Sequence, residues 1–353
     1  MDIRKKTNQI IMDFISTIFV VAVSLIISLI TPINFLTGVM TIFIVAMVPS
    51  FMLISIAWEC NYPKCISSIS QPWKGLSYLS MCILIGSFVI VGLWAFIDSE
   101  LTKGQVNTVV FIVSSVPVCL FLLTTFQSWP FNKLSGNQLI IGLYLLIFTY
   151  ALNYFIYSIF MNFQNLYDAN GIDIAKGIYP HETVLAIMIA AVIPMMLLNQ
   201  FDSWPITLFY DRVPMLARQP FNGIIKSAYI TLFTFCFYYS FIILGDVNIT
   251  YFVNILCVSL IFGCFIIQVM FKGLPFINIR QPWRGIVLMI ISVLLSIGMS
   301  SLYIKLATLW LENTDQSVIA MWLAPSLLSV TFPLMVIFAD FFQGWPIKRR
   351  PNQ

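Results

Sequence analysis

Residues 14–30 read FISTIFVVAVSLIISLI, a run without a charged side chain that is long enough to cross the hydrocarbon core of a bilayer as one α-helix. Nine further segments of the chain have the same character. The sequence predicts spans near residues 9–30, 35–57, 75–97, 106–126, 137–160, 182–201, 223–244, 251–271, 285–307 and 317–342. We therefore expect an all-α, polytopic transmembrane helical bundle of about ten spans, folded as a single integral membrane domain over residues 1–353.

The composition of the 353 residues supports this class. Hydrophobic residues make up 60% of the chain and charged residues only 9%, so lipid must solvate most of its surface. The alternation of apolar and polar residues that marks a membrane β-strand is absent, which favours helices over a barrel. The basic start at Arg4, Lys5 and Lys6 resembles the front of a signal peptide. No small-residue cleavage site follows the long apolar run, however, so we expect the first span to be retained.

The basic residues divide unevenly between the two sets of connections. Fifteen of the 18 lie in the set that includes both termini, whereas the other set holds only Lys103, Lys176 and Lys305. Because Lys and Arg in short loops resist translocation, the sequence predicts a multi-pass protein of the plasma (inner) membrane with both termini in the cytoplasm. An odd number of spans would mix the two sets, so the asymmetry also favours an even number.

Short strings recur after every second predicted span, at the end that the charges place in the cytoplasm. The clearest copy is Phe126-Gln-Ser-Trp129-Pro130, and the prolines of the five copies are 67, 75, 70 and 71 residues apart. A second string, such as Gln281-Pro-Trp-Arg-Gly285, opens several of the following spans. The copies of the first string end at Pro63, Pro130, Pro205, Pro275 and Pro346, and those of the second are residues 71–75, 219–223 and 281–285.

This regularity predicts five tandem helix-hairpin repeats of about 70 residues. Because each unit has two spans, all five share one orientation, which makes the repeat parallel rather than inverted. Several of the second spans carry internal prolines, although the span that ends at Phe271 has none. Such prolines kink a helix either for packing alone or to widen a central cavity for a ligand or a gate. The approximate units are residues 1–65, 66–132, 133–207, 208–277 and 278–353, and the internal prolines are Pro49, Pro117, Pro194, Pro325 and Pro333.

Polar side chains within the predicted spans are the candidates for substrate binding. Tyr150, Asn153, Tyr154 and Tyr157 lie at i, i+3, i+4 and i+7, so they share one face of the fifth span. Gln268 is a further amide in the hydrocarbon. An amide in lipid needs a hydrogen-bond partner, so the same residues also fit helix–helix packing.

A group of tryptophans and arginines at the cytoplasmic end of the spans predicts a docking surface for a partner. Interfacial tryptophan is also an ordinary membrane anchor, and proline after a helix is an ordinary stop signal, so a structural role stays open. The residues of the predicted docking surface are Trp129, Trp204, Trp283, Trp345, Arg280 and Arg284.

Residues that usually carry catalysis or bind metals are scarce. His181 is the single histidine, and it cannot furnish a multi-histidine metal site. Cys60 and Cys65 share a loop on the reducing side, where we expect free thiols. Asp13 and Asp340 are the only carboxylates close to the hydrocarbon, and both lie near the cytoplasmic end. We therefore predict no catalytic residue, no metal site and no cofactor, and a non-enzymatic role is favoured.

Two short strings, Arg218-Gln219-Pro220-Phe221 and Trp204-Pro205-Ile206, resemble strings in a membrane-spanning component of the ammonia and particulate methane monooxygenases. The resemblance covers fewer than ten residues, which stand here in the reverse order. Those complexes depend on histidine and carboxylate metal ligands that this chain does not offer, so their function is not carried over.

Three function classes fit these features. The first is a permease or channel-like protein for a small, weakly charged or apolar solute, which suits the many spans and the internal prolines. The second is a non-catalytic integral subunit of a larger membrane complex. The third is a lipid-modifying membrane enzyme, for which Cys60, Cys65, His181 and the aspartates are the only candidates. The expected partners are membrane lipids and either a membrane protein or further copies of the chain, and nucleic acid is excluded because no folded basic domain is present.

Overall fold

The computed structural model describes residues 3–96, 105–164, 177–310 and 315–347. About 81% of the chain is helical, and ten helices among the described residues are long and apolar enough to cross a membrane. The predicted all-α, multi-pass class is thus confirmed. The ten spans are span 1 (Asn8–Ile30), span 2 (Ile33–Ala57), span 3 (Trp73–Leu93), span 4 (Asn107–Thr125), span 5 (Gln138–Phe160), span 6 (His181–Gln200), span 7 (Phe221–Leu244), span 8 (Ile249–Met270), span 9 (Trp283–Trp310) and span 10 (Ser317–Phe341).

Half of the spans are regular α-helices and half contain wide π-helical turns. The regular helices are α1 (Ile3–Ile30), α5 (Trp73–Phe96), α8 (Gln138–Phe160), α10 (His181–Gln200) and α14 (Trp283–Trp310). The other five spans combine α-helical segments with π-helical turns. Their α-helical segments are α2 (Ile33–Phe35) and α3 (Thr41–Met52) in span 2, α6 (Gln105–Leu120) in span 4, α11 (Phe221–Tyr238) in span 7, α12 (Ile249–Tyr251) and α13 (Val258–Phe265) in span 8, and α15 (Gln316–Pro325) and α16 (Phe332–Val336) in span 10. Outside the spans lie α4 (Lys64–Ser67), α7 (Phe131–Leu134) and a parallel pair of two-residue strands, β1 (Met161–Asn162) and β2 (Tyr179–Pro180).

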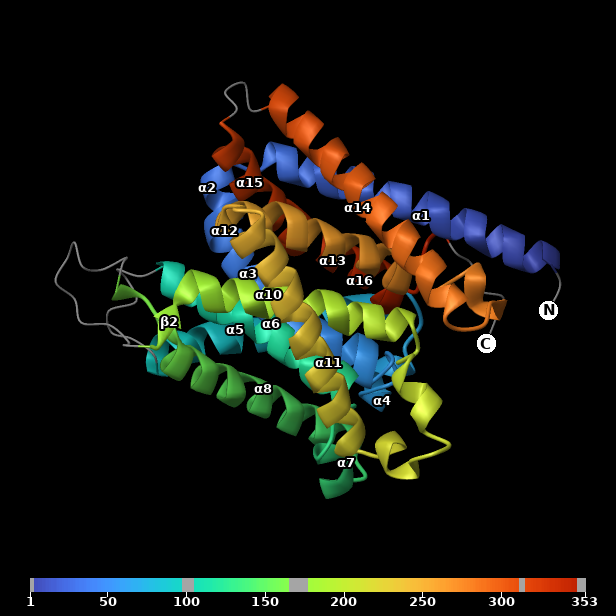
Figure 1. The fold of residues 1–353 in the computed structure, drawn as a ribbon. Helices are drawn as coiled ribbons and strands as arrows, with labels where there is room; N and C mark the ends of the chain where they lie inside the picture. The colour runs from blue at the N-terminus through green and yellow to red at the C-terminus, as the bar shows by residue number, and fades with distance from the viewer. Residues whose placement is uncertain (1–2, 97–104, 165–176, 311–314, 348–353) are drawn as a thin grey trace.

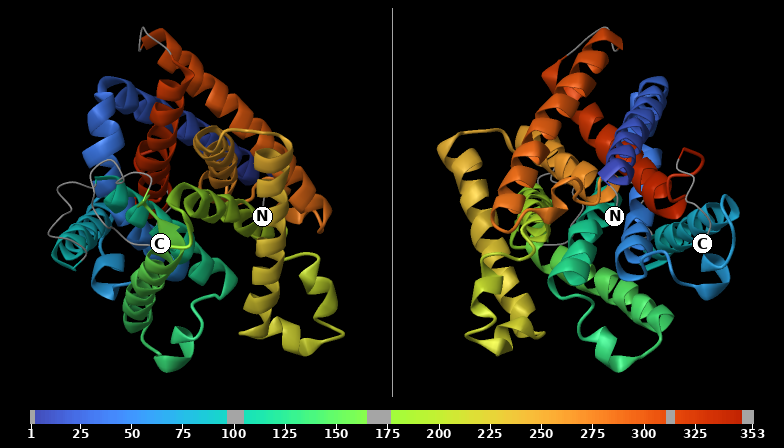
Figure 2. Two further views of the ribbon diagram at one scale, coloured as in Figure 1. Left: turned by 60° about the vertical axis from the view of Figure 1, so that its left-hand side comes forward. Right: turned by 90° about the vertical axis from the view of Figure 1, so that its right-hand side faces the viewer.

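The spans form two shells (Figures 1 and 2). In the most apolar 18 residues of each even-numbered span, 56–72% of residues are buried, against 11–33% in the odd-numbered spans. The even-numbered spans pack in sequence, α3 on α6, α6 on α10, α10 on α13, and α13 on the turn 326–331 of span 10. Span 10 then returns to α3, so the five form a closed inner ring.

The odd-numbered spans cover this ring from outside. Each packs against the inner span that precedes it in the chain: α5 lies on α3, α8 on α6, α11 on α10 and α14 on α13. The helix α1 packs on the turn 326–331 of span 10. It therefore covers the inner ring at span 10.

The five Phe–Trp–Pro-type strings lie at one end of the bundle, which we call the Trp–Pro end. Both the start of α1 and the end of span 10 lie there too (Figure 1). After the aromatic residue that ends each inner span, two residues have positive φ and the following X-Pro bond is cis. The aromatic residues are Trp58, Phe126, Phe201, Phe271 and Phe342, and the cis bonds precede Pro63, Pro130, Pro205, Pro275 and Pro346. The geometry recurs in all five strings, while the tandem repeat itself stays a prediction.

The second string holds three of the outer spans, α5, α11 and α14, against inner ones. At the start of α14, the side-chain amide of Gln281 donates to the carbonyl of Gln200 at 3.0 Å and its oxygen accepts from the backbone N–H of Gly285 at 3.0 Å. A side chain at Gly285 would not fit, because its Cβ would lie 2.4 Å from the ring of Phe201. The same bonds join Gln71 to Phe341 and Gly75, and Gln219 to Thr125 and Gly223.

Candidate functional site

The inner ring encloses a cavity at its Trp–Pro end, which we call the vestibule. Its volume is about 310 Å³, the size of a small-molecule pocket. All five inner spans line it. Because no outer span contributes, the vestibule lies on the axis of the ring and not between the shells.

Each inner span places one polar side chain at the vestibule, and we call these five residues the rim. They occupy equivalent places, two or three residues before the aromatic residue that ends the span. A polar group there lies within a turn of the helix end, close to the Trp–Pro end of the bundle. The rim consists of Ser55, Thr124, Asn199, Gln268 and Asp340.

One ion pair crosses the rim. The ammonium of Lys272, just after span 8, lies 3.3 Å from the carboxylate oxygen Oδ1 of Asp340 in span 10. The side chain of Asp340 is only 16% exposed, whereas that of Lys272 is 61% exposed. Because a pair with one exposed partner is screened by water and costs side-chain entropy, it contributes little to stability. Breaking the pair would leave the mostly buried carboxylate of Asp340 without a partner, so Lys272 can be replaced only by another cation.

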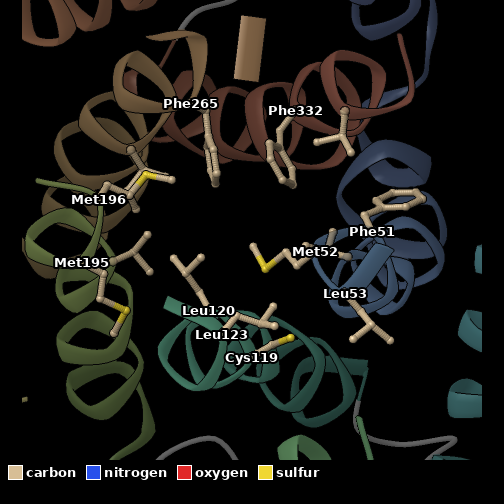
Figure 3. Packing of buried hydrophobic residues seen from close by; sticks show 14 of the residues in the cluster. Phe51, Met52, Leu53, Cys119, Leu120, Leu123, Met195, Met196, Phe265 and Phe332 are labelled. Carbon is tan, nitrogen blue, oxygen red and sulfur yellow. The ribbon is translucent and has the colours of Figure 1, made fainter. Parts of the chain in front are cut away.

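Apolar side chains, which we call the floor, line the vestibule below the rim. Phe265 and Phe332 lie with ring centroids 4.2 Å apart, and Met52 and Leu120 point into the same space from the other side of the ring (Figure 3). With Met196 they represent all five inner spans. They are buried, so the axis of the ring is closed to water at this level. The floor consists of Met52, Leu120, Met196, Phe265 and Phe332.

The internal prolines act close to the floor. Pro49, Pro117 and Pro194 lie within inner helices, and each removes a backbone donor from its helix. Wide π-helical turns follow at 53–57 and 121–125, where the backbone reaches the rim. π-Helical turns often mark functional sites, because the altered hydrogen bonding re-aims side chains.

Gln268 is the one predicted substrate-binding residue that lines the vestibule. Its side-chain amide donates to the carbonyl of Met196 at 2.9 Å, which joins spans 8 and 6. Because a carbonyl can only accept, this bond fixes the orientation of the amide and leaves its oxygen as an acceptor.

The other predicted substrate-binding residues lie on α8, outside the inner ring. Tyr150 donates to the carbonyl of Ala46 at 3.4 Å and Asn153 donates to that of Phe111 at 2.8 Å, so both tie α8 to inner helices. Tyr157 is buried and packs on the ring of Phe111. Tyr154 is 53% exposed on the outside of α8. The stripe does not form one face toward a cavity, and its role as a binding surface stays a prediction.

The predicted docking residues are spread around the Trp–Pro end. Trp283 and Trp345 are exposed. Arg284 binds Asp202 at 3.0 Å, and the same carboxylate accepts from Gln281 at 2.8 Å, which fixes this arginine within the molecule. Trp129 and Trp204 are partly buried and stack on the phenylalanines of their own strings, and Arg280 is exposed.

The candidate reactive residues lie at two ends of the bundle: Cys60, Cys65 and Asp340 at the Trp–Pro end, and His181 after β2 at the other end (Figure 1). Cys60 is buried in the loop after span 2, and this burial, with the negative charge of Asp340 as a smaller cause, raises the pKa of its thiol to about 12. Cys65 is exposed in the same loop. The ring of His181 stacks on Phe163 with centroids 4.6 Å apart. In the described part of the chain, no group of three or more His, Cys, Asp and Glu residues could hold a metal ion.

Comparison with known proteins adds no further assignment. No protein-family model matches the chain. No curated protein and no solved structure matches it either. The geometry of the vestibule is therefore the basis for a functional proposal.

Proposed function

We propose that the protein is a channel-like membrane permease for a small, weakly charged or apolar solute, which passes along the axis of the inner ring. One observation carries this proposal: all five inner spans contribute both a polar rim and an apolar floor to a single cavity on that axis. Cavities on the axis of a ring of spans are the usual location of a transport path.

The architecture and orientation belong to the same proposal. Five tandem hairpin units would each supply one inner span, and the recurring backbone geometry at the five strings supports this reading. The excess of Lys and Arg at the Trp–Pro end supports a cytoplasmic position for that end in the plasma membrane. The vestibule would then open to the cytoplasm.

The rim and the floor would select solutes in different ways. A solute first exchanges water for the oxygen and nitrogen atoms of the rim. It then meets the floor, where a narrow apolar constriction excludes water and hydrated ions by dewetting. The flexible thioethers of Met52 and Met196 are suited to move aside for a small molecule. Such a path favours solutes whose dehydration costs little free energy.

A blocking substitution in the floor tests this path. Leu120 is buried and borders the vestibule, so the larger indole of Leu120→Trp has space to extend into it. We expect the variant to abolish uptake of small solutes into proteoliposomes, measured by stopped-flow light scattering over a panel of neutral and weakly charged molecules. Leu84→Trp is the matched control, because Leu84 is 70% exposed on an outer span and the change should leave uptake unaltered. Equal uptake by both variants would rule out the axial path.

The orientation is tested by the two cysteines of one loop. A membrane-impermeant maleimide should label exposed Cys65 in inside-out vesicles but not in intact cells. Cys60 should resist labelling even at pH 9, because its thiolate forms only as the pH approaches its raised pKa of about 12. Intact mass of Cys65→Ser after the same treatment is the control. Labelling of Cys65 in intact cells would place the Trp–Pro end outside.

A second candidate function, a non-catalytic integral subunit of a larger complex, has one specific observation in its favour. Only 11% of the residues in the most apolar part of span 7 are buried, and α11 runs along the outside of the bundle in both views of Figure 2. A partner chain could cover this helix. Native mass spectrometry of the protein from its own membrane would detect such a partner as a stoichiometric adduct.

A further inference from the structure

The rim presents hydrogen-bond acceptors to the vestibule, and the carboxylate of Asp340 is the strongest of them. The hydroxyl of Thr124 donates to the carbonyl of Leu120 at 2.8 Å, so only its lone pairs remain. One N–H of the Gln268 amide donates to Met196, and the amide oxygen remains as an acceptor. The carboxylate of Asp340 accepts only. A ligand that binds to the Asp340 carboxylate must supply donors.

Two further features mark the place where such a ligand would bind. The buried hydroxyl of Ser55 lies beside the Asp340 carboxyl and stabilises its negative charge, and it makes no other side-chain hydrogen bond within the described residues. Asp340 is bound on one oxygen by the ammonium of Lys272. The site therefore already holds one alkylammonium group, which is tethered to the protein and reaches in from the exposed side.

The floor provides the complementary apolar surface. Phe265 and Phe332 lie beside Met52 and Met196 directly below the acceptors. Aromatic faces attract cations and also bury alkyl or aryl groups. A ligand with an ammonium head and an apolar tail would satisfy the carboxylate and the floor together.

We propose that the vestibule is a binding site for a small organic ammonium ion with an apolar tail, and that the Lys272 ammonium competes with this ligand for Asp340. This rests on the proposed function, because it names the solute class for the same cavity. The released lysine has room to move, since its side chain is mostly exposed. Exchange of one ammonium for another keeps the charge of Asp340 balanced at each step.

Binding of benzylammonium to the purified full-length protein in nanodiscs, followed by isothermal titration calorimetry, tests the proposal. Benzyl alcohol is the neutral analogue of the same shape. We expect the wild type to bind benzylammonium saturably. Asp340→Asn should bind it at least about tenfold more weakly, because a charge-assisted hydrogen bond is lost. Lys272→Met should bind it up to about fivefold more tightly, because a competing ammonium of modest affinity is removed. Asp211→Asn, at an exposed carboxylate of the loop after span 6, is the matched control and should bind like the wild type.

Three results would overturn the inference. The first is that neither the wild type nor Lys272→Met binds benzylammonium saturably. The second is that benzyl alcohol binds as tightly as benzylammonium. The third is that Asp340→Asn leaves the affinity for benzylammonium unchanged. The uptake assay of Leu120→Trp is separate, since it needs no ammonium solute. Loss of uptake in that variant together with absent benzylammonium binding would keep the permease and reject this solute class.

Discussion

A single methyl group added at residue 263 should disrupt the packing of spans 8 and 9. A Cβ at Gly263 would lie 2.1 Å from the backbone oxygen of Ser292 and 3.1 Å from its carbonyl carbon. Both atoms belong to the backbone, so no side-chain rotation relieves the clash and the two helices must move apart. We expect Gly263→Ala to cost about 3 kcal/mol, the upper part of the usual range for overpacking.

The loss should spread beyond the clash, because the same interface carries polar bonds. The hydroxyl of Ser300 donates to that of Ser259 at 2.5 Å, and Gln200 donates to the hydroxyl of Ser292 at 2.9 Å. Separating α13 from α14 breaks the first bond and removes Ser292 from span 6. A lower midpoint in thermal unfolding, followed by size-exclusion chromatography in detergent, would report this.

Gly298→Ala is the control for helix propensity on the partner helix. A Cβ at Gly298 meets no atom within 4 Å, and alanine is the better helix former by about 0.5–1 kcal/mol. This variant should be as stable as the wild type or slightly more stable. If Gly263→Ala and Gly298→Ala unfold at the same temperature, the close approach of spans 8 and 9 is wrong.

The sequence was sufficient to predict the spans themselves. Residues 9–30, 137–160 and 182–201 were expected, and Asn8–Ile30, Gln138–Phe160 and His181–Gln200 are found. Length and apolar composition determine such spans, because the bilayer sets both requirements. Which spans lie inside could not be predicted in the same way, since lipid and protein interior are equally apolar and helix association in lipid depends on detailed packing.

The vestibule was only partly accessible to prediction. Gln268 is conspicuous as an amide in hydrocarbon, whereas Ser55 and Thr124 look like ordinary small polar residues near a helix end. Asp340 was expected close to the hydrocarbon near the cytoplasmic end, and it pairs with Lys272 there. What the sequence did not show is that five segments, each far apart in the chain, place these groups around one axis. The sequence did contain one indication of this arrangement: each of the five polar residues lies two or three positions before the aromatic residue of a string.

Opening the floor should have the largest effect on transport. Phe332 packs its ring on Phe265 and borders the vestibule, so Phe332→Ala removes much of the apolar constriction. Each 1.4 kcal/mol removed from a barrier raises a rate about tenfold. We expect Phe332→Ala to raise solute flux into proteoliposomes by at least about tenfold and to admit small ions that the wild type excludes, measured with an encapsulated ion-sensitive dye.

The substitution also leaves a cavity, and a Phe→Ala change in a core costs about 3–5 kcal/mol of stability. A leak through a partly unfolded bundle must therefore be separated from a leak through the axis. Phe341→Ala makes the same change in the same span at a fully buried side chain that does not line the cavity, because it packs on Tyr78 and on the outer side of the lining residue Phe51. Because its cost in stability is similar and its place is away from the axis, it should not leak. A leak of equal size in both variants would mean that loss of packing, and not opening of the floor, lets solutes through.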